Sequence, residues 1–244
     1  MVSTVFQQKK YLGQNFIYDK DFLSSLIKDI KLDKLVIEIG MGKGTLTEVL
    51  SRRAKKVITF EIDKTLKPAL PPNVEIIYGD ALENDFTRFD DFIVVANLPY
   101  YITTPLIIKF MRLKHCRALY LMVQKEVAER IVSRPNAKSY GALSVLCQTM
   151  GKTEILRHVP RDKFSPPPKV DSAFISIIKN EVEFDISLGK VLKDAFSKRR
   201  KKLSNIFSKE VLEESGINGN LRPENLSSTD FLKIRHALCG KISM

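Results

Sequence analysis

Short apolar runs alternate with amphipathic stretches along most of the chain. The runs that predict strands lie near residues 35, 57, 74, 92, 118, 153 and 173. The first amphipathic stretch follows Asp19, an expected helix N-cap, and places five apolar side chains on one face: Phe22, Leu23, Leu26, Ile27 and Ile30. Alternating strands and helices up to about residue 180 predict a mostly parallel sheet with helices on both faces.

The pattern changes after residue 185 and becomes wholly helical. Helices are expected over 188–207, 209–215 and 229–238, with Gly216, Gly219 and Pro223 between them. We therefore expect a catalytic domain over residues 1–185 and a small helical domain over 186–244. Pro166-Pro167-Pro168 is too rigid for a helix or a strand and predicts a loop before this boundary.

Three predicted strands end in residues suited to a nucleoside. The strand at 36–39 runs into Gly40-Met41-Gly42-Lys43-Gly44 and then a helix, so the backbone there can approach a ligand closely. The next strand ends at Glu61, 21 residues after Gly40, where a carboxylate can accept from ribose hydroxyls. The third ends in Gly79-Asp80-Ala81, where a second carboxylate can accept from an adenine amino group.

The glycine spacing narrows the choice of ligand. It reads G-x-G-x-G, and neither the dinucleotide pattern G-x-G-x-x-G nor the phosphate-loop pattern is present. A ligand with adenine and ribose but no phosphate fits better, and S-adenosylmethionine is such a ligand. The alternative is a generic doubly wound protein whose glycines only form tight turns.

The fourth strand ends in Asn97-Leu98-Pro99-Tyr100, which suits an exocyclic amine. The lone pair of adenine N6 is delocalised into the ring, so two acceptors must hold its hydrogens before it attacks. The Asn97 side-chain oxygen is one candidate, and Pro99 biases Leu98 toward an extended conformation that presents its carbonyl as the second. Tyr100 offers an aromatic face for a flipped base. The alternative is a strand followed by an Asn-X-Pro turn with a core tyrosine.

Together these motifs resemble the KsgA-type ribosomal RNA adenine dimethyltransferases over nearly the whole chain. The matching blocks are Gly13–Phe16, Glu38–Gly44, Asn97–Tyr100, Met122–Ala128, Tyr140–Val145, Phe164–Ser172, Phe196–Asn205 and Arg222–Ser227. The resemblance implies a Rossmann-like class I methyltransferase sheet that binds S-adenosylmethionine, plus a small all-helical C-terminal domain. Large-subunit RNA methylases of this fold typically carry Asn-Ile-Pro-Tyr and Ser-Gln-Asn-Phe at two of these blocks. This chain has Asn97–Tyr100 and Gly13–Phe16 there and so resembles the KsgA type at both. Departures are Ile17, where leucine is usual, and Tyr101, where asparagine is common.

The resemblance also implies roles for particular residues. Gly13–Phe16 resembles the family's N-terminal lid motif, which covers the cofactor. Cofactor contacts fall on this lid, the glycine turn and the next strand ends: Asn15, Ile17, Gly40, Gly42, Glu61, Asp80, Ala81 and Asn97. The catalytic motif is Asn97, Leu98, Pro99 and Tyr100. Phe164 is expected to sandwich the target base opposite Tyr100; alternatively, it only anchors its loop to the core. The implied reaction is dimethylation of N6 on two adjacent adenosines in the 3′-terminal loop of small-subunit ribosomal RNA, on an immature subunit.

The charge of the chain agrees with an RNA substrate. The formal net charge is +12, and residues 186–244 hold 12 Lys or Arg against 6 acidic residues, so they carry half of the excess. The densest run is Lys198, Arg199, Arg200, Lys201 and Lys202. Such a run is often only a solvated helix face, but beside an adenine motif it predicts phosphate contacts, which supply affinity rather than sequence selectivity.

Other classes of protein are disfavoured. The three cysteines and three histidines show no metal-ligand or disulfide spacing, and no stretch predicts a signal peptide or membrane helix. We expect a cytoplasmic monomer without a metal. Two alternatives remain: an RNA-binding assembly factor that keeps the fold without catalysis, and a DNA adenine methylase that uses the same tetrapeptide.

Overall fold

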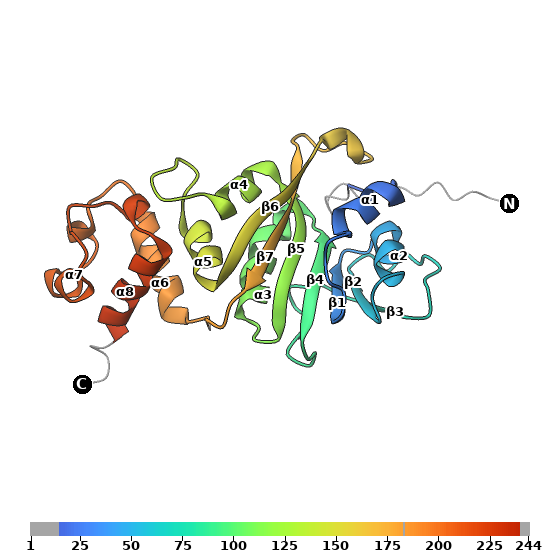
Figure 1. Cartoon of the computed structure of the whole chain (residues 1–244), viewed down its shortest axis with the longest axis horizontal. Coiled ribbons are helices and arrows are strands. Elements are labelled where there is room, and N and C mark those ends of the chain that lie inside the picture. Colours follow the sequence, from blue (N-terminus) through green and yellow to red (C-terminus); the bar gives the residue numbers. More distant parts are fainter. Residues whose placement is uncertain (1–14, 183, 240–244) are drawn as a thin grey trace. The chain divides into compact units, whose positions relative to one another are not determined.

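The computed structural model describes residues 15–182 and 184–239 (Figure 1). Seven strands form one sheet in the order β3-β2-β1-β4-β5-β7-β6. Their bounds are Leu35–Ile39 (β1), Val57–Glu61 (β2), Val74–Tyr78 (β3), Phe92–Asn97 (β4), Cys116–Gln124 (β5), Gly151–Val159 (β6) and Ser172–Lys179 (β7). Every strand predicted from the sequence is present.

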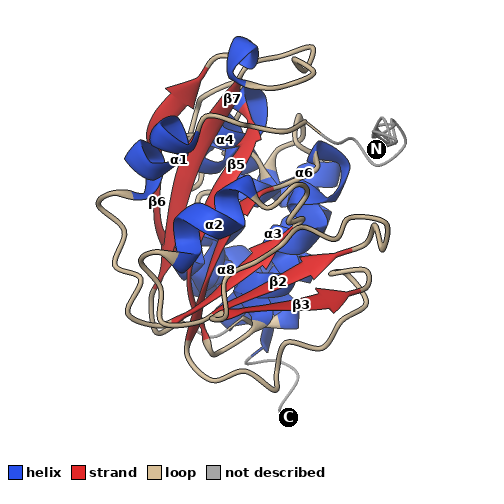
Figure 2. Ribbon diagram, turned by 90° about the vertical axis from the view of Figure 1, so that its right-hand side faces the viewer, coloured by secondary structure: helices blue, strands red, loops and turns tan. Residues whose placement is uncertain are grey.

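The first five strands pair in parallel, as predicted. β1 pairs with β2 and β4, β2 with β3, and β4 with β5; β2 and β3 lie side by side in Figure 2. In the register, Ile39 is opposite Phe60 and Glu61 is opposite Tyr78. The carboxyl ends of these strands therefore meet at one edge of the sheet, which is where ligands bind in open parallel sheets.

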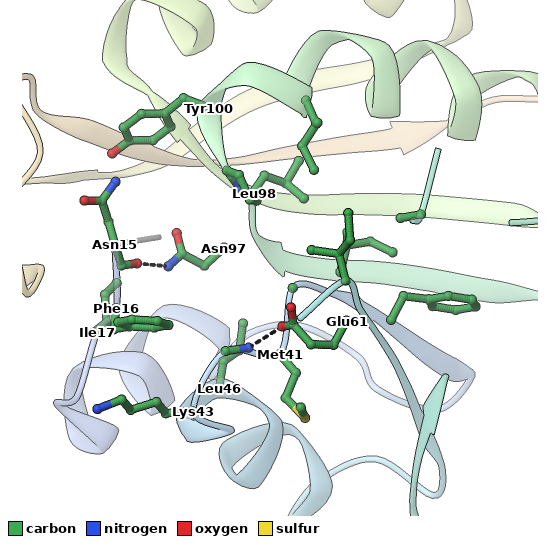
Figure 3. A pocket seen from close by; sticks show the side chains of 18 of the residues that line it. Asn15, Phe16, Ile17, Met41, Lys43, Leu46, Glu61, Asn97, Leu98 and Tyr100 are labelled. Atoms are coloured by element: carbon green, nitrogen blue, oxygen red, sulfur yellow. Dashed lines mark hydrogen bonds between the residues drawn. The ribbon is translucent and has the colours of Figure 1, made fainter. Parts of the chain in front are cut away.

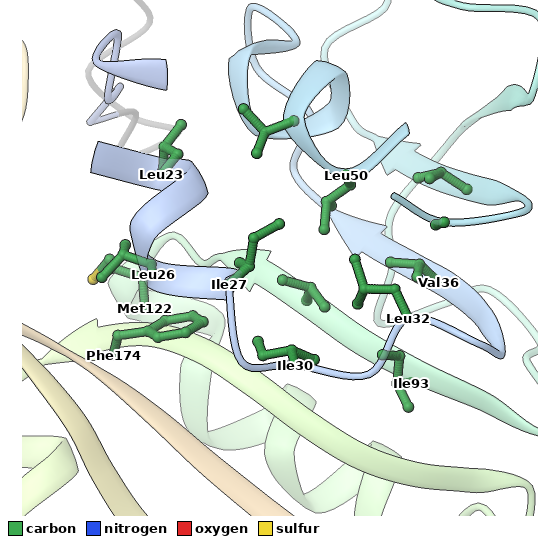
Figure 4. Close-up of a cluster of buried hydrophobic side chains, with 14 of the residues drawn as sticks. Leu23, Leu26, Ile27, Ile30, Leu32, Val36, Leu50, Ile93, Met122 and Phe174 are labelled. Carbon is green, nitrogen blue, oxygen red and sulfur yellow. The ribbon is translucent and has the colours of Figure 1, made fainter. Parts of the chain in front are cut away.

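Helices cover both faces of this sheet. Helices α1 (Lys20–Ile27) and α2 (Thr45–Ser51) bury apolar side chains on one face, where Leu26, Ile27 and Leu50 join Met122 and Phe174 in a common core (Figure 4). Asp19 caps α1 as expected, accepting a hydrogen bond from Phe22 N at 2.8 Å. Alternate strand residues point to the other face, where α3 (Thr103–Arg112) contributes to an aromatic cluster of Phe60, Phe86, Phe89, Phe92 and Phe110.

Contacts divide the chain into two units, 1–125 with 156–176 and 126–155 with 177–244. The second unit contains α4 (Lys125–Val132), α5 (Ala142–Met150), α6 (Ile186–Ser197), α7 (Lys209–Ser215) and α8 (Ser228–Cys239). Lys125, the first residue of α4, still belongs to the first unit. Tyr140 is fully buried in the second unit and donates to Leu226 O at 2.8 Å, and its ring meets Phe196, which in turn contacts Phe231. The functional division expected at residue 185 stays a prediction.

One helix prediction is wrong in extent. The helix expected over 188–207 ends at Ser197, and the basic run that follows forms a turn leading into a single 3-10 turn, Leu203–Asn205. Five consecutive cations in a helix would place like charges three and four residues apart, which is unfavourable. Side-chain contacts also hold the turn, because Lys202 Nζ donates to Asn220 Oδ1 at 3.0 Å.

Within the described ranges, no helix combines the length and the apolar composition that crossing a bilayer requires.

Candidate active site

A pocket opens at the carboxyl edge of β1, β2, β3 and β4, entirely within the first unit (Figure 3). Its walls include every residue that was predicted to contact the cofactor or to form the catalytic motif: Asn15, Ile17, Gly40, Gly42, Glu61, Asp80, Ala81, Asn97, Leu98, Pro99 and Tyr100. These residues come from five separate segments. The sheet brings them together because successive parallel strands end side by side. Gly13 and Gln14 of the predicted lid motif lie outside the described residues.

The side chain of Asn97 has a defined orientation. Its Nδ2 donates to the Asn15 backbone carbonyl at 2.9 Å. Because a carbonyl oxygen only accepts, this contact decides which end of the amide is nitrogen. Oδ1 is therefore the accepting end of the amide, and in Figure 3 it points toward the side of the pocket on which Tyr100 lies.

The segment after Asn97 is compact. Ile102 N donates to the Pro99 carbonyl at 3.2 Å, which closes the 3-10 turn Tyr100–Ile102 directly before α3. Leu98 is buried. The Tyr100 hydroxyl lies 2.8 Å from Ser172 Oγ on β7. Burial raises the pKa of Tyr100, so its hydroxyl stays protonated at neutral pH.

The glycine turn needs its glycines at two positions in particular. Gly40 and Gly42 have φ values of 76° and 58°, a region that residues with a Cβ rarely adopt. A Cβ on Gly42 would lie 2.7 Å from the Phe16 ring. The lid residue Phe16 is thus packed directly on the turn, and its backbone exchanges two hydrogen bonds with Ser165.

The carboxylate of Glu61 is held by backbone amides. Its Oε2 accepts from Gly42 N at 2.9 Å and its Oε1 from Asp63 N at 2.8 Å. Burial raises its pKa, while these two amide bonds act in the opposite direction. A third backbone amide, that of Ile62, also lowers the pKa, and a carboxylate has about four lone-pair sites, so acceptor capacity remains at Glu61. Asp80 is similar, since its Oδ1 accepts from Leu82 N at 2.8 Å and no other described residue forms a hydrogen bond with its carboxylate.

The pocket also contains residues that motif analysis did not select. Ile62 and Tyr101 are 46% and 58% exposed and both line it. Burial and the nearby charges of Asp80 and Glu61 raise the pKa of Tyr101. This departure from the family pattern therefore lies near both of these carboxylates. Ile62 could have been predicted to line the pocket from the sequence, because it is an apolar residue directly after Glu61.

Glu38, to which the sequence analysis assigned no role, has surroundings that indicate a structural role. It is fully buried beneath the glycine turn and accepts from Thr47 Oγ1 at 2.6 Å. Burial raises its pKa to about 8. It does not line the pocket.

Phe164 and Arg199, both predicted to contact the substrate, pack or pair with other parts of the chain. Phe164 is 3% exposed and belongs to the apolar core with Leu26 and Phe174, so the structure does not bring it into the pocket with Tyr100. This matches the alternative in which Phe164 anchors its loop, and stacking on it stays a prediction. In the basic run, Arg199 pairs with Glu224 at 2.7 Å, whereas Lys198, Arg200, Lys201 and Lys202 are exposed.

The donor set fits S-adenosylmethionine. Two carboxylates and the Asn97 amide offer acceptors for hydroxyls, amines and a positive charge, and they would repel a phosphate. The apolar side chains of Phe16, Leu46 and Ile62 suit an adenine ring. Among the described side chains, no cluster of three or more His, Cys, Asp or Glu is arranged to hold a metal. Fold and pocket together define a Rossmann-like class I S-adenosylmethionine-dependent methyltransferase.

Comparisons with known proteins narrow this class. The sequence profile of the ribosomal RNA adenine dimethylase family matches residues 5–238. The ribosomal RNA small subunit methyltransferase A of Caldanaerobacter subterraneus is 42% identical, with 94% of this chain and 97% of that protein covered. Its counterpart from a Geobacillus species is 39% identical, with 96% and 92% covered.

Solved structures agree. A dimethyladenosine transferase from Plasmodium falciparum superposes with a TM-score of 0.83 at 30% identity and covers 93% of this chain and 98% of its own. The 23S rRNA methyltransferase ErmE shares the fold, with a TM-score of 0.71 at 22% identity over 92% of this chain and all of its own. The chain belongs to the ribosomal RNA adenine dimethylase family and is an S-adenosylmethionine-dependent rRNA adenine dimethyltransferase.

Proposed function

We propose that this chain methylates N6 of two adjacent adenosines in the 3′-terminal loop of small-subunit ribosomal RNA, giving N6,N6-dimethyladenosine. We further propose that it acts in the cytoplasm, as a monomer, on an immature small ribosomal subunit. Curated relatives of nearly full length that are named as small-subunit methyltransferases support this choice of RNA. The observation that carries the chemistry is the orientation of Asn97, whose Nδ2 is bound to Asn15 O so that Oδ1 can accept.

The proposed mechanism relies on positioning rather than on a strong base. S-adenosylmethionine supplies a methyl group already activated by a positively charged sulfur. Asn97 Oδ1 and the Leu98 carbonyl accept the two N6 hydrogens, so that the nitrogen lone pair is turned out of conjugation and toward the methyl carbon. The new N–C bond forms as the C–S bond breaks, and the extra proton leaves to water. The first transfer leaves one N–H, so one acceptor suffices for the second.

The other residues hold the two reactants. We assign Glu61 to the ribose, Asp80 and Ala81 to the adenine of the cofactor, Gly40 and Gly42 to the turn beneath it, and Asn15 and Ile17 to the lid. Tyr100 is the stacking platform for the target base. Lys198, Arg200, Lys201 and Lys202, in the helical domain assigned to residues 186–244, contact phosphates. Arg199 is a weaker candidate for a phosphate contact, because its charge is already paired with that of Glu224.

Labelled S-adenosylmethionine tests this assignment when several acceptors are compared. We expect transfer to small ribosomal subunits that lack the modification, and much less to protein-free RNA, large subunits or duplex DNA. Mass analysis of the nucleosides should find dimethyladenosine. Preferred methylation of DNA would instead identify a DNA adenine methylase, and tight binding to small subunits without any transfer would identify an assembly factor.

A further inference from the structure

The polar tip of Tyr100 is held by a buried residue to which the family resemblance assigned no role. The Tyr100 hydroxyl and Ser172 Oγ are 2.8 Å apart, and either can donate. Ser172 is 0% exposed, whereas Tyr100 is only partly buried. The two residues are 72 positions apart in sequence but belong to the same unit, since residues 156–176 pack with the first 125.

Ser172 is well suited as a fixed anchor. It is the first residue of β7 and is followed by the buried residues Ala173 and Phe174. The preceding residue, Asp171, is held by two hydrogen bonds of 3.0 Å, from Lys125 N to its carbonyl and from Arg161 N to its Oδ1. A hydroxyl on such a backbone cannot follow a moving partner, so it holds that partner in place.

The Tyr100 ring is only partly buried. It begins the 3-10 turn Tyr100–Ile102, in which no residue is buried, and the ring borders the open pocket. Two side-chain torsions orient a tyrosine ring, and the hydroxyl at its far end is the point where one hydrogen bond restrains both. A stacking platform accelerates transfer only if its orientation already suits the target base.

We propose that Ser172 is a positioning residue for adenine methylation: its bond to the Tyr100 hydroxyl holds the ring in the orientation that receives the target base beside Asn97. The proposal rests on the proposed role of Tyr100 as the stacking platform. It assigns no contact between Ser172 and either substrate. Its prediction is that loss of the hydroxyl at either end of the bond slows transfer while the ring itself remains.

Four variants and a matched control test the proposal in the full-length chain. Ser172→Ala and Tyr100→Phe each remove one hydroxyl, the double variant removes both, and Tyr100→Ala removes the ring. Ser176→Ala is the control, because Ser176 is a buried serine on the same face of β7 and does not line the pocket. The measurements are kcat and KM with small subunits that lack the modification, the Kd for S-adenosylmethionine, and the thermal unfolding temperature.

We expect Ser172→Ala and Tyr100→Phe each to lower kcat by about three- to tenfold, the range set by one hydrogen bond. The Kd for S-adenosylmethionine should stay within about twofold of the parent value. The double variant should be no slower than the slower single variant, because both remove the same bond. A purely structural role for Ser172 would instead lower the unfolding temperature and weaken cofactor binding without this coupling.

Contrary outcomes are distinguishable. If Ser172→Ala and Tyr100→Phe keep the parent kcat while Tyr100→Ala loses it, the anchor proposal is wrong and the platform role survives. If the two single effects multiply in the double variant, the two hydroxyls act independently and the proposal is also wrong. Full activity of Tyr100→Ala would overturn the platform itself. Should Ser172→Ala fail to fold, Tyr100→Phe still decides, since an unchanged kcat there overturns the proposal.

Discussion

At the scale of the residue, the catalytic hypothesis depends on which end of the Asn97 amide faces the pocket. A lone asparagine after a strand does not define this, because both ends of an amide make hydrogen bonds. The contact from Nδ2 to Asn15 O defines it, and it comes from a segment 82 positions away in sequence. One backbone carbonyl of the lid thus orients the acceptor at the end of β4.

Asn97→Asp separates orientation from the mere presence of an oxygen. A carboxylate keeps an acceptor but cannot donate to Asn15 O, and the two oxygens repel each other. We expect kcat to fall by about a hundredfold, as misplacement of a catalytic group by about 1 Å does. The Kd for S-adenosylmethionine should not rise, because the added negative charge faces a cation. Methyl-transfer kinetics and cofactor titration measure both quantities, and a variant within about tenfold of the parent rate would contradict the orientation argument.

Glu38 makes a prediction about stability and pH. Its pKa is raised from 4.5 to about 8 in the folded chain, so between these values the folded state keeps a proton that the unfolded state has lost. The free energy of unfolding should therefore fall as pH rises through this window, by up to about 1.4 kcal/mol per unit, and level off above it. Glu38→Gln keeps an acceptor for Thr47 and removes the titration.

Urea unfolding of the parent and of Glu38→Gln from about pH 5 to about pH 8.5 measures the effect. The difference in unfolding free energy between the two proteins should shift steadily in favour of the glutamine variant. Groups common to both proteins cancel in this difference. Parallel curves would show that Glu38 is ionised in the folded state across the whole range.

At the scale of the element, the glycine turn and the lid form one structural feature. Phe16 occupies the space beside Gly42 in which a side chain would lie, and Lys43 lies 5.9 Å from the centre of the Phe16 ring. Glu61 at the end of β2 binds the amide of the same glycine. The turn is therefore tied to Phe16 on one side and to the Glu61 carboxylate on the other.

Gly42→Ala should disturb both connections. The new Cβ meets the Phe16 ring at 2.7 Å, and φ is 58°, so we expect a loss of about 1 to 3 kcal/mol in unfolding free energy. The Kd for S-adenosylmethionine should rise by about tenfold or more as Phe16 is displaced. Gly141→Ala is the control, because a Cβ there meets nothing within 4 Å and φ is −167°. Equal cofactor affinity in the two variants would show that the lid does not depend on this contact.

At the scale of the whole molecule, the excess positive charge has two different uses. Arg199 pairs with Glu224 and also donates to Ala137 O at 3.3 Å, so it helps to hold the second unit together. The other four cations of the run are exposed. Composition alone does not distinguish Arg199 from the other four cations.

Neutralising variants separate these uses. Lys198→Gln and Lys201→Gln should each weaken binding to small subunits and reduce the slope of log affinity against log salt concentration by about 0.7 to 0.9. Arg199→Gln should instead lower the unfolding free energy by about 1 kcal/mol and leave the salt slope nearly unchanged. Salt-dependent binding assays and urea unfolding provide the two measurements. A slope change for Arg199→Gln as large as for its neighbours would place it among the phosphate contacts.

Local patterns in the sequence were sufficient for the strands, the cap at Asp19 and the glycine turn. Each of these depends on residues close in sequence, and alternation or a fixed spacing reveals them. The strand ends also predicted that Gly40, Glu61, Asp80 and Asn97 line one pocket, because parallel strands place their carboxyl ends together. Asn15 and Ile17 were predicted from the family resemblance.

Only the tertiary structure decided the contacts that join distant segments. They include the bond from Asn97 to Asn15, the anchor of Tyr100 on Ser172, the burial of Phe164 and the pairing of Arg199 with Glu224. The end of α6 at Ser197 belongs with them, since the side chains of Arg199 and Lys202 bind residues 25 and 18 positions later. Such partners are set by how the elements pack, and a single sequence carries no periodic signal for them.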